Sequence, residues 1–92
     1  MDLQGSLPWY IGKMVTVTRI QTGVRMETRL LKVLKAIAEY KNLSLGDLLE
    51  GICLHAIEGK EAFSRETLAK IADLKRAYEL DLAAADSHQL QE

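Results

Sequence analysis

The apolar positions of this chain change from an alternating pattern to a helical one near residue 28. Residues 21–26 alternate between two sides, which predicts a short strand. Residues 13–20 also alternate and are rich in β-branched side chains, so they either extend this strand or form a separate one. An isolated strand needs a partner for its backbone groups, and a second copy of the chain is the simplest partner.

From Thr28 the apolar residues recur at helical spacing, which predicts a first helix that ends at Lys41 and Asn42. A second helix is expected to begin at Ser44, whose hydroxyl can accept a hydrogen bond from the first turn, and to end at Gly59. The two helices are therefore separated by a short turn.

A third helix is predicted from Ser64, as its N-cap, to Leu80. Residues 81–92 are rich in alanine and then polar, and we expect them to fray. Near the other end, Pro8 lies beside Trp9, which predicts an irregular arm with an apolar anchor.

A strand followed by two short amphipathic helices resembles the ribbon-helix-helix family of dimeric DNA-binding proteins, across residues 21–57 of the 92 in the chain. The resemblance implies a mainly α fold in which the N-terminal strand pairs antiparallel across a homodimer, with an additional C-terminal helix. It divides the chain into an arm or strand extension at residues 1–20, a ribbon-helix-helix core at 21–59, and a C-terminal helical extension and tail at 60–92.

The resemblance also implies that a two-stranded ribbon enters the major groove and contacts bases through Gln21, Gly23 and Arg25. Arginine can bond guanine and glutamine can bond adenine in that groove, which agrees with this role. Gly23 departs from the pattern because it has no side chain, so either the backbone approaches DNA closely there or the ribbon ends. Thr22, at an inward position, is a second departure.

The family binds a phosphate with the amides at the start of its second helix, which correspond here to Ser44, Leu45 and Gly46. A capped helix N-terminus has free donors and a partial positive charge. The simpler alternative is that Ser44 only caps the helix.

The core of the dimer is expected to combine residues of the strand and of both helices. These residues are Val24, Met26, Leu30, Leu34, Ile37, Leu48, Leu49, Ile52 and Cys53. Because Cys53 is the single cysteine of the chain, we expect a reduced, buried thiol and a cytoplasmic protein.

The net charge of −1 hides an uneven distribution. Residues 1–45 carry seven Lys or Arg and three Asp or Glu, whereas residues 46–92 carry five and ten. One basic face can therefore meet phosphates while the acidic remainder limits non-specific binding. Apolar residues make up 48% of the chain, yet no apolar run is long enough to span a membrane. No secretory signal is expected either.

No residue pattern indicates catalysis, a cofactor or a metal site: His55 and Glu58 share a helix face, but two ligands do not form a metal site. The sequence therefore predicts a sequence-specific DNA-binding homodimer that acts as a small transcriptional regulator. One alternative is an antitoxin-like DNA-binding protein whose C-terminal part binds a protein partner. Another is a dimerisation or scaffold module that does not bind DNA.

Overall fold

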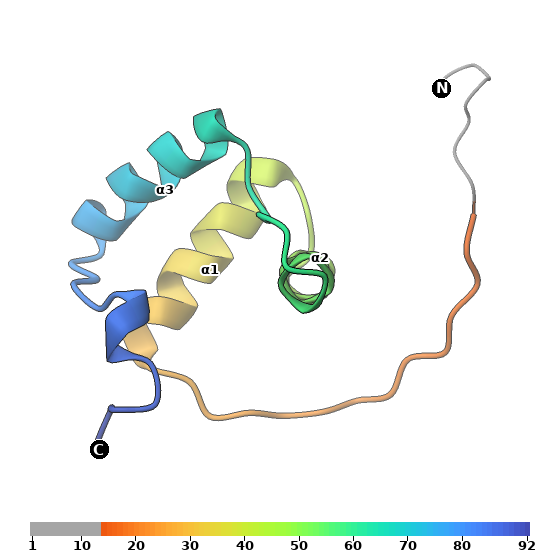
Figure 1. Ribbon diagram of the computed structural model, residues 1–92, viewed down its shortest axis with the longest axis horizontal. Coiled ribbons are helices and arrows are strands. Elements are labelled where there is room, and N and C mark those ends of the chain that lie inside the picture. Colours follow the sequence, from red (N-terminus) through yellow and green to blue (C-terminus); the bar gives the residue numbers. More distant parts are fainter. Residues whose placement is uncertain (1–13) are drawn as a thin grey trace.

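The structure, a computed structural model that describes residues 14–92, is built from three α-helices (Figure 1). They are α1 (Thr28–Lys41), α2 (Leu45–Ile57) and α3 (Arg65–Ala77), followed by a short 3₁₀ turn, η1 (Ala84–Asp86). Helix α1 contacts both α2 and α3 and lies between them in Figure 1. The folded part is therefore organised around α1.

The ends of the helices follow the residues that the sequence analysis identified. Asn42 adopts a left-handed conformation with φ of 61°, and its amide bonds the last turn of α1. The hydroxyl of Ser44 accepts a hydrogen bond from the Asp47 amide at 3.1 Å, and Ser64 caps α3 in the same way. The predicted starts of α2 and α3 are confirmed, although α3 ends at Ala77 rather than at Leu80.

The core lies where α1 meets its two neighbours and the C-terminal segment, residues 79–92. Its buried apolar side chains are Val33, Ile37, Ala38, Leu48 and Leu80. Partly buried apolar residues pack around them: Leu34, Ile52, Phe63, Ile71, Leu74 and Leu82. Helix α2 has the most apolar sequence of the three helices, yet it contributes only Leu48 to the buried set.

The predicted strand is wrong. Residues 14–27 form an extended segment that leaves the start of α1, and no β-strand occurs anywhere in residues 14–92 (Figure 1). A strand is defined by hydrogen bonds to a neighbouring strand, and this part of the chain offers no second one. The described fold is all-helical, so the ribbon-helix-helix fold with an N-terminal strand paired across a homodimer is not observed. Residues 1–13, which hold most of the expected arm, lie outside the described residues.

The fraying expected for residues 81–92 is contradicted at Leu82 and in η1, whereas residues 87–92 are exposed. Leu80 is buried and Leu82 packs against the core, so the C-terminal segment covers part of α1. The Ala83 amide donates to the Asp86 carboxylate at 2.8 Å, which closes η1. The ion pair between Glu92 and Arg25 places the C-terminus near the start of α1 (Figure 1).

Candidate nucleic-acid interface

The extended segment, residues 14–27, is exposed along most of its length. Every residue from 14 to 25 is exposed, including the apolar Val24, whose side chain is 77% exposed. Within residues 14–92, no backbone hydrogen bond joins residues 14–26 to the rest of the chain. Within the described part of the chain, the backbone donors and acceptors of residues 14–26 therefore have no backbone partner.

The three residues predicted to contact bases all lie on this exposed segment. Gln21 and Gly23 are exposed, and a Cβ placed on Gly23 would meet no atom of the chain within 4 Å. The backbone at Gly23 is thus open to close approach from outside. Arg25 is exposed as well and forms an ion pair with Glu92 of the C-terminal segment.

The start of α2 presents the residues predicted to bind a phosphate. Ser44 and Gly46 are exposed, Leu45 is half-buried, and the space beside Gly46 is open. Among the first amides of the helix, that of Asp47 is occupied by the Ser44 hydroxyl. The remaining donors of this helix end face solvent or a bound anion.

A groove of about 460 Å³ brings two of the predicted groups together. Gln21 and Thr22 line one side of it, and Ser44 and Gly46 line the other. Arg25 does not belong to this groove and lies instead near Glu92. Gln21 and the start of α2 therefore line the same groove, whereas Arg25 lies outside it.

Arg19 is a residue of this groove that the sequence analysis did not select. Its guanidinium donates two hydrogen bonds of 2.8 Å to the Glu50 carboxylate, and it lies 3.9 Å from Asp47. These hydrogen bonds lower the pKa of Glu50. The alternation of residues 21, 23 and 25 extends back to position 19, and this signal was available in the sequence.

The residues expected to form a dimer core divide into two groups in the single chain. Leu34, Ile37, Leu48 and Ile52 take part in the core of the chain itself. The others are more accessible: Val24, Leu30 and Cys53 are exposed, and Met26 and Leu49 are half-buried. The burial expected for Cys53 is therefore not observed in the single chain.

An apolar row runs along α2 beside the core. Leu49, Cys53 and Ile57 follow one another at intervals of four residues, so they share one side of the helix. The row becomes more accessible toward the end of the helix, where Ile57 is 81% exposed. We call these three residues the α2 row.

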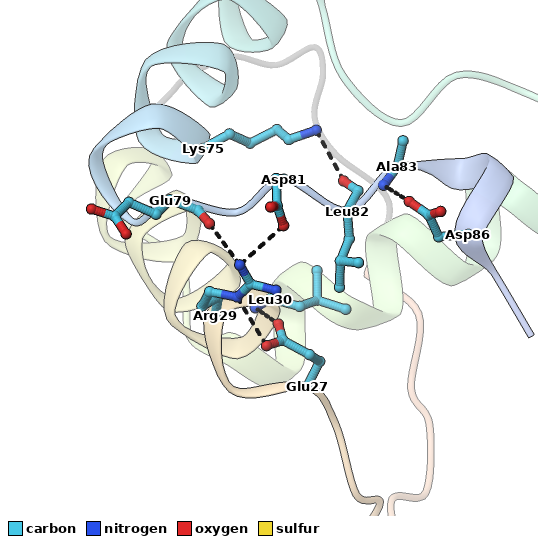
Figure 2. A network of polar contacts seen from close by, with 9 residues as sticks. All are labelled: Glu27, Arg29, Leu30, Lys75, Glu79, Asp81, Leu82, Ala83 and Asp86. Atoms are coloured by element: carbon cyan, nitrogen blue, oxygen red, sulfur yellow. Dashed lines mark hydrogen bonds and ion pairs between the residues drawn. The ribbon is translucent and has the colours of Figure 1, made fainter. Parts of the chain in front are cut away.

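A second set of polar contacts holds the C-terminal segment to α1 (Figure 2). The Arg29 guanidinium donates to the carbonyl oxygen of Glu79 at 2.9 Å and to the Asp81 carboxylate at 3.0 Å. Glu27 accepts from Arg29 and also from the Leu30 amide at 2.8 Å, which makes it the N-cap of α1. That amide bond, assisted by Arg29, lowers the pKa of Glu27.

Among residues 14–92, no three His, Cys, Asp or Glu side chains are grouped closely enough to hold a metal ion. The Nδ1 atom of His55 instead lies 2.7 Å from the carbonyl oxygen of Gly51. None of the helices α1, α2 and α3 is long and apolar enough to cross a membrane.

Comparison with known proteins gives no relative. No protein-family model matches the chain, and no curated protein and no solved structure matches it.

Proposed function

We propose that this chain is a DNA-binding homodimer that acts as a small transcriptional regulator in the cytoplasm, without a catalytic step. The extended segment contacts base edges through Gln21 and Arg25. The start of α2, at Ser44, Leu45 and Gly46, binds a phosphate. Two copies associate through the α2 row.

The observation that carries the proposal is the groove between the extended segment and the start of α2. It places Gln21, which can bond adenine, beside a helix N-terminus, which attracts anions. Protein contacts to phosphates set the position of a protein on DNA, and contacts to bases provide its specificity. Both kinds of contact are therefore available from neighbouring parts of one surface.

The acidic groups of this surface are already paired with arginines. Arg19 forms an ion pair with Glu50 and a longer one with Asp47, and Arg25 forms an ion pair with Glu92. Exposed ion pairs contribute only about 0–1 kcal/mol, so a phosphate or a guanine can replace a carboxylate as the partner of arginine. Binding of DNA by Arg25 would thus release Glu92.

The second copy is supported by the α2 row, in which Cys53 and Ile57 are exposed. An apolar row on the most apolar helix, left open in a chain with a small core, is typical of an interface between protein subunits. A dimer would also present two extended segments and two helix starts, related by a twofold axis, to a DNA site with the same symmetry.

A second candidate is a homodimeric scaffold that does not bind DNA. It is favoured by the pairing of both Arg19 and Arg25 with carboxylates of the same chain. The antitoxin-like alternative has less support, because the C-terminal segment packs against α1 of its own chain rather than extending toward a partner.

The test is selection of duplexes from a randomised pool, followed by affinity measurements on variants. Arg25→Ala should lose about 1–3 kcal/mol and relax the preference at one base pair in each half-site. Gly46→Glu should weaken binding to all sequences alike, because it sets a negative charge beside the bound phosphate. Lys70→Ala, on an exposed part of α3, is the control and should change little.

Two results would overturn the proposal. In the first, no duplex is enriched by the parent protein, which would favour the scaffold. In the second, Arg25→Ala and Gly46→Glu both bind the selected duplex as the parent does, which would place the DNA contacts elsewhere.

A further inference from the structure

A cavity of about 360 Å³ lies between α1, α3 and the C-terminal segment. Apolar side chains from all three parts line it, among them Leu34 of α1, Ile71 of α3, and Leu82 and Leu90 of the C-terminal segment. Small-molecule sites in proteins typically measure about 300–1,000 Å³ and combine apolar walls with a few polar groups. The cavity has both properties.

Lys75 and Asp86 are the charged residues of the cavity wall, and they differ in their hydrogen-bond partners. Lys75 is half-buried and reaches from α3 to the carbonyl oxygen of Leu82, at 3.3 Å from its Nζ (Figure 2). No carboxylate of residues 14–92 lies within 4 Å of that Nζ atom. The Asp86 carboxylate, by contrast, accepts from the Ala83 amide within η1.

The position of Lys75 defines the charge that the cavity can accept. An ammonium group has three N–H donors, and the bond to Leu82 uses one of them. The other two can bond an anionic group at the edge of the apolar space, and a charged donor makes such bonds stronger than neutral ones. A molecule with an apolar body and one carboxylate matches this arrangement.

We propose that the cavity binds a small apolar carboxylic acid of the medium-chain fatty acid type. Its carboxylate bonds Lys75, and its hydrocarbon chain lies along Leu34, Ile71 and Leu82. This site is separate from the proposed DNA interface, and it stands whether or not the protein binds DNA.

The experiment uses the full chain with ¹³C-labelled methyl groups and three ligands of equal length: octanoate, 1-octanol and octylamine. Octanoate should shift the methyl signals of Leu34, Ile71 and Leu82 to saturation. Octanol should bind about tenfold more weakly, because it lacks the charge-assisted bond to Lys75. Each methylene added to the acid should tighten binding about fourfold, the factor that corresponds to about 0.8 kcal/mol for a buried CH₂.

Variants of Lys75 test the role of its positive charge. Lys75→Met keeps the length and the apolar stem but should bind octanoate no better than octanol. Lys75→Arg keeps the charge and should keep the preference for the acid. Lys70→Met is the matched control, because Lys70 belongs to α3, as Lys75 does, and lies outside the cavity, over the Tyr40 ring of α1.

The proposal is overturned if octanoate causes no saturable methyl shifts, or if octylamine binds as tightly as octanoate and thereby identifies Asp86 as the binding charge. It is also overturned if a folded Lys75→Met variant keeps the preference for the acid. Should that variant unfold, the comparison of the three ligands on the parent and on Lys75→Arg decides.

Discussion

Replacing Cys53 by aspartate separates the stability of the single chain from the stability of the dimer. Cys53 is exposed in the single chain, in the middle of the α2 row. An aspartate there faces solvent as long as the chain is alone, and exposed substitutions usually change stability by within about 0.5 kcal/mol. In a dimer formed through the α2 row, the same carboxyl group is buried without a partner.

The size of the effect follows from the cost of burying that group. Burial can raise the pKa of a carboxyl group by about three units, which corresponds to about 4 kcal/mol. A symmetric dimer buries two such groups, so association should lose about 8 kcal/mol, which equals the whole binding free energy of a dimer with a micromolar Kd. Cys53→Asp should therefore abolish the dimer at micromolar concentration.

Sedimentation equilibrium measures this directly. The parent should sediment at twice the 10.3 kDa chain mass, and Cys53→Asp should not. His55→Asp is the matched control: His55 is exposed and lies about 160° around α2 from Cys53, so its aspartate variant should remain dimeric. A parent protein that is monomeric, or a Cys53→Asp variant that sediments as a dimer, would refute the assignment of the α2 row as the interface.

Three further predictions concern the folded chain. Ser44→Ala removes the cap of α2 and should lower the free energy of unfolding by about 1 kcal/mol, measured by thermal denaturation. An unchanged thermal unfolding midpoint would contradict the capping role. Because the pKa of Glu27 is lowered in the folded state, its contribution to stability is present above the pKa of the unfolded carboxyl and lost as pH falls through the folded pKa. Unfolding midpoints of Glu27→Gln should accordingly depend less on acid pH than those of the parent, and parallel curves would exclude this contribution. Arg29→Ala removes the bonds to Glu79 and Asp81, so limited proteolysis should cleave residues 79–92 faster than in the parent, and equal rates would show that these bonds do not hold the segment.

The helices were predictable because their signals are local. The hydroxyls of Ser44 and Ser64 each accept a hydrogen bond from the amide three residues later. Asn42 ends α1 because its own backbone adopts the left-handed conformation. Such features depend on a few neighbouring residues, so the sequence is enough to locate them. Gln21 and Ser44 are predicted from the resemblance, and in the structure both line one groove.

The remaining features depend on contacts between distant residues. A strand at residues 21–26 requires a hydrogen-bonding partner, and alternation of side chains predicts an extended backbone without supplying that partner. The C-terminal segment is held by Arg29, which bonds a residue 50 positions away. Leu82 stands in a segment without helical spacing, so its packing against the core could not be inferred from periodicity.

The salt dependence of DNA affinity is the decisive measurement for DNA binding by this protein. It is measured by fluorescence anisotropy on the duplex that the parent protein selects, between 50 and 200 mM salt, a range over which binding through phosphate contacts is known to weaken. If each protomer of the dimer neutralises one phosphate, affinity should fall about tenfold across this range and linearly on logarithmic axes. An affinity that does not change with salt, or the absence of any selected duplex, would show that this protein is not a DNA-binding dimer that contacts phosphates.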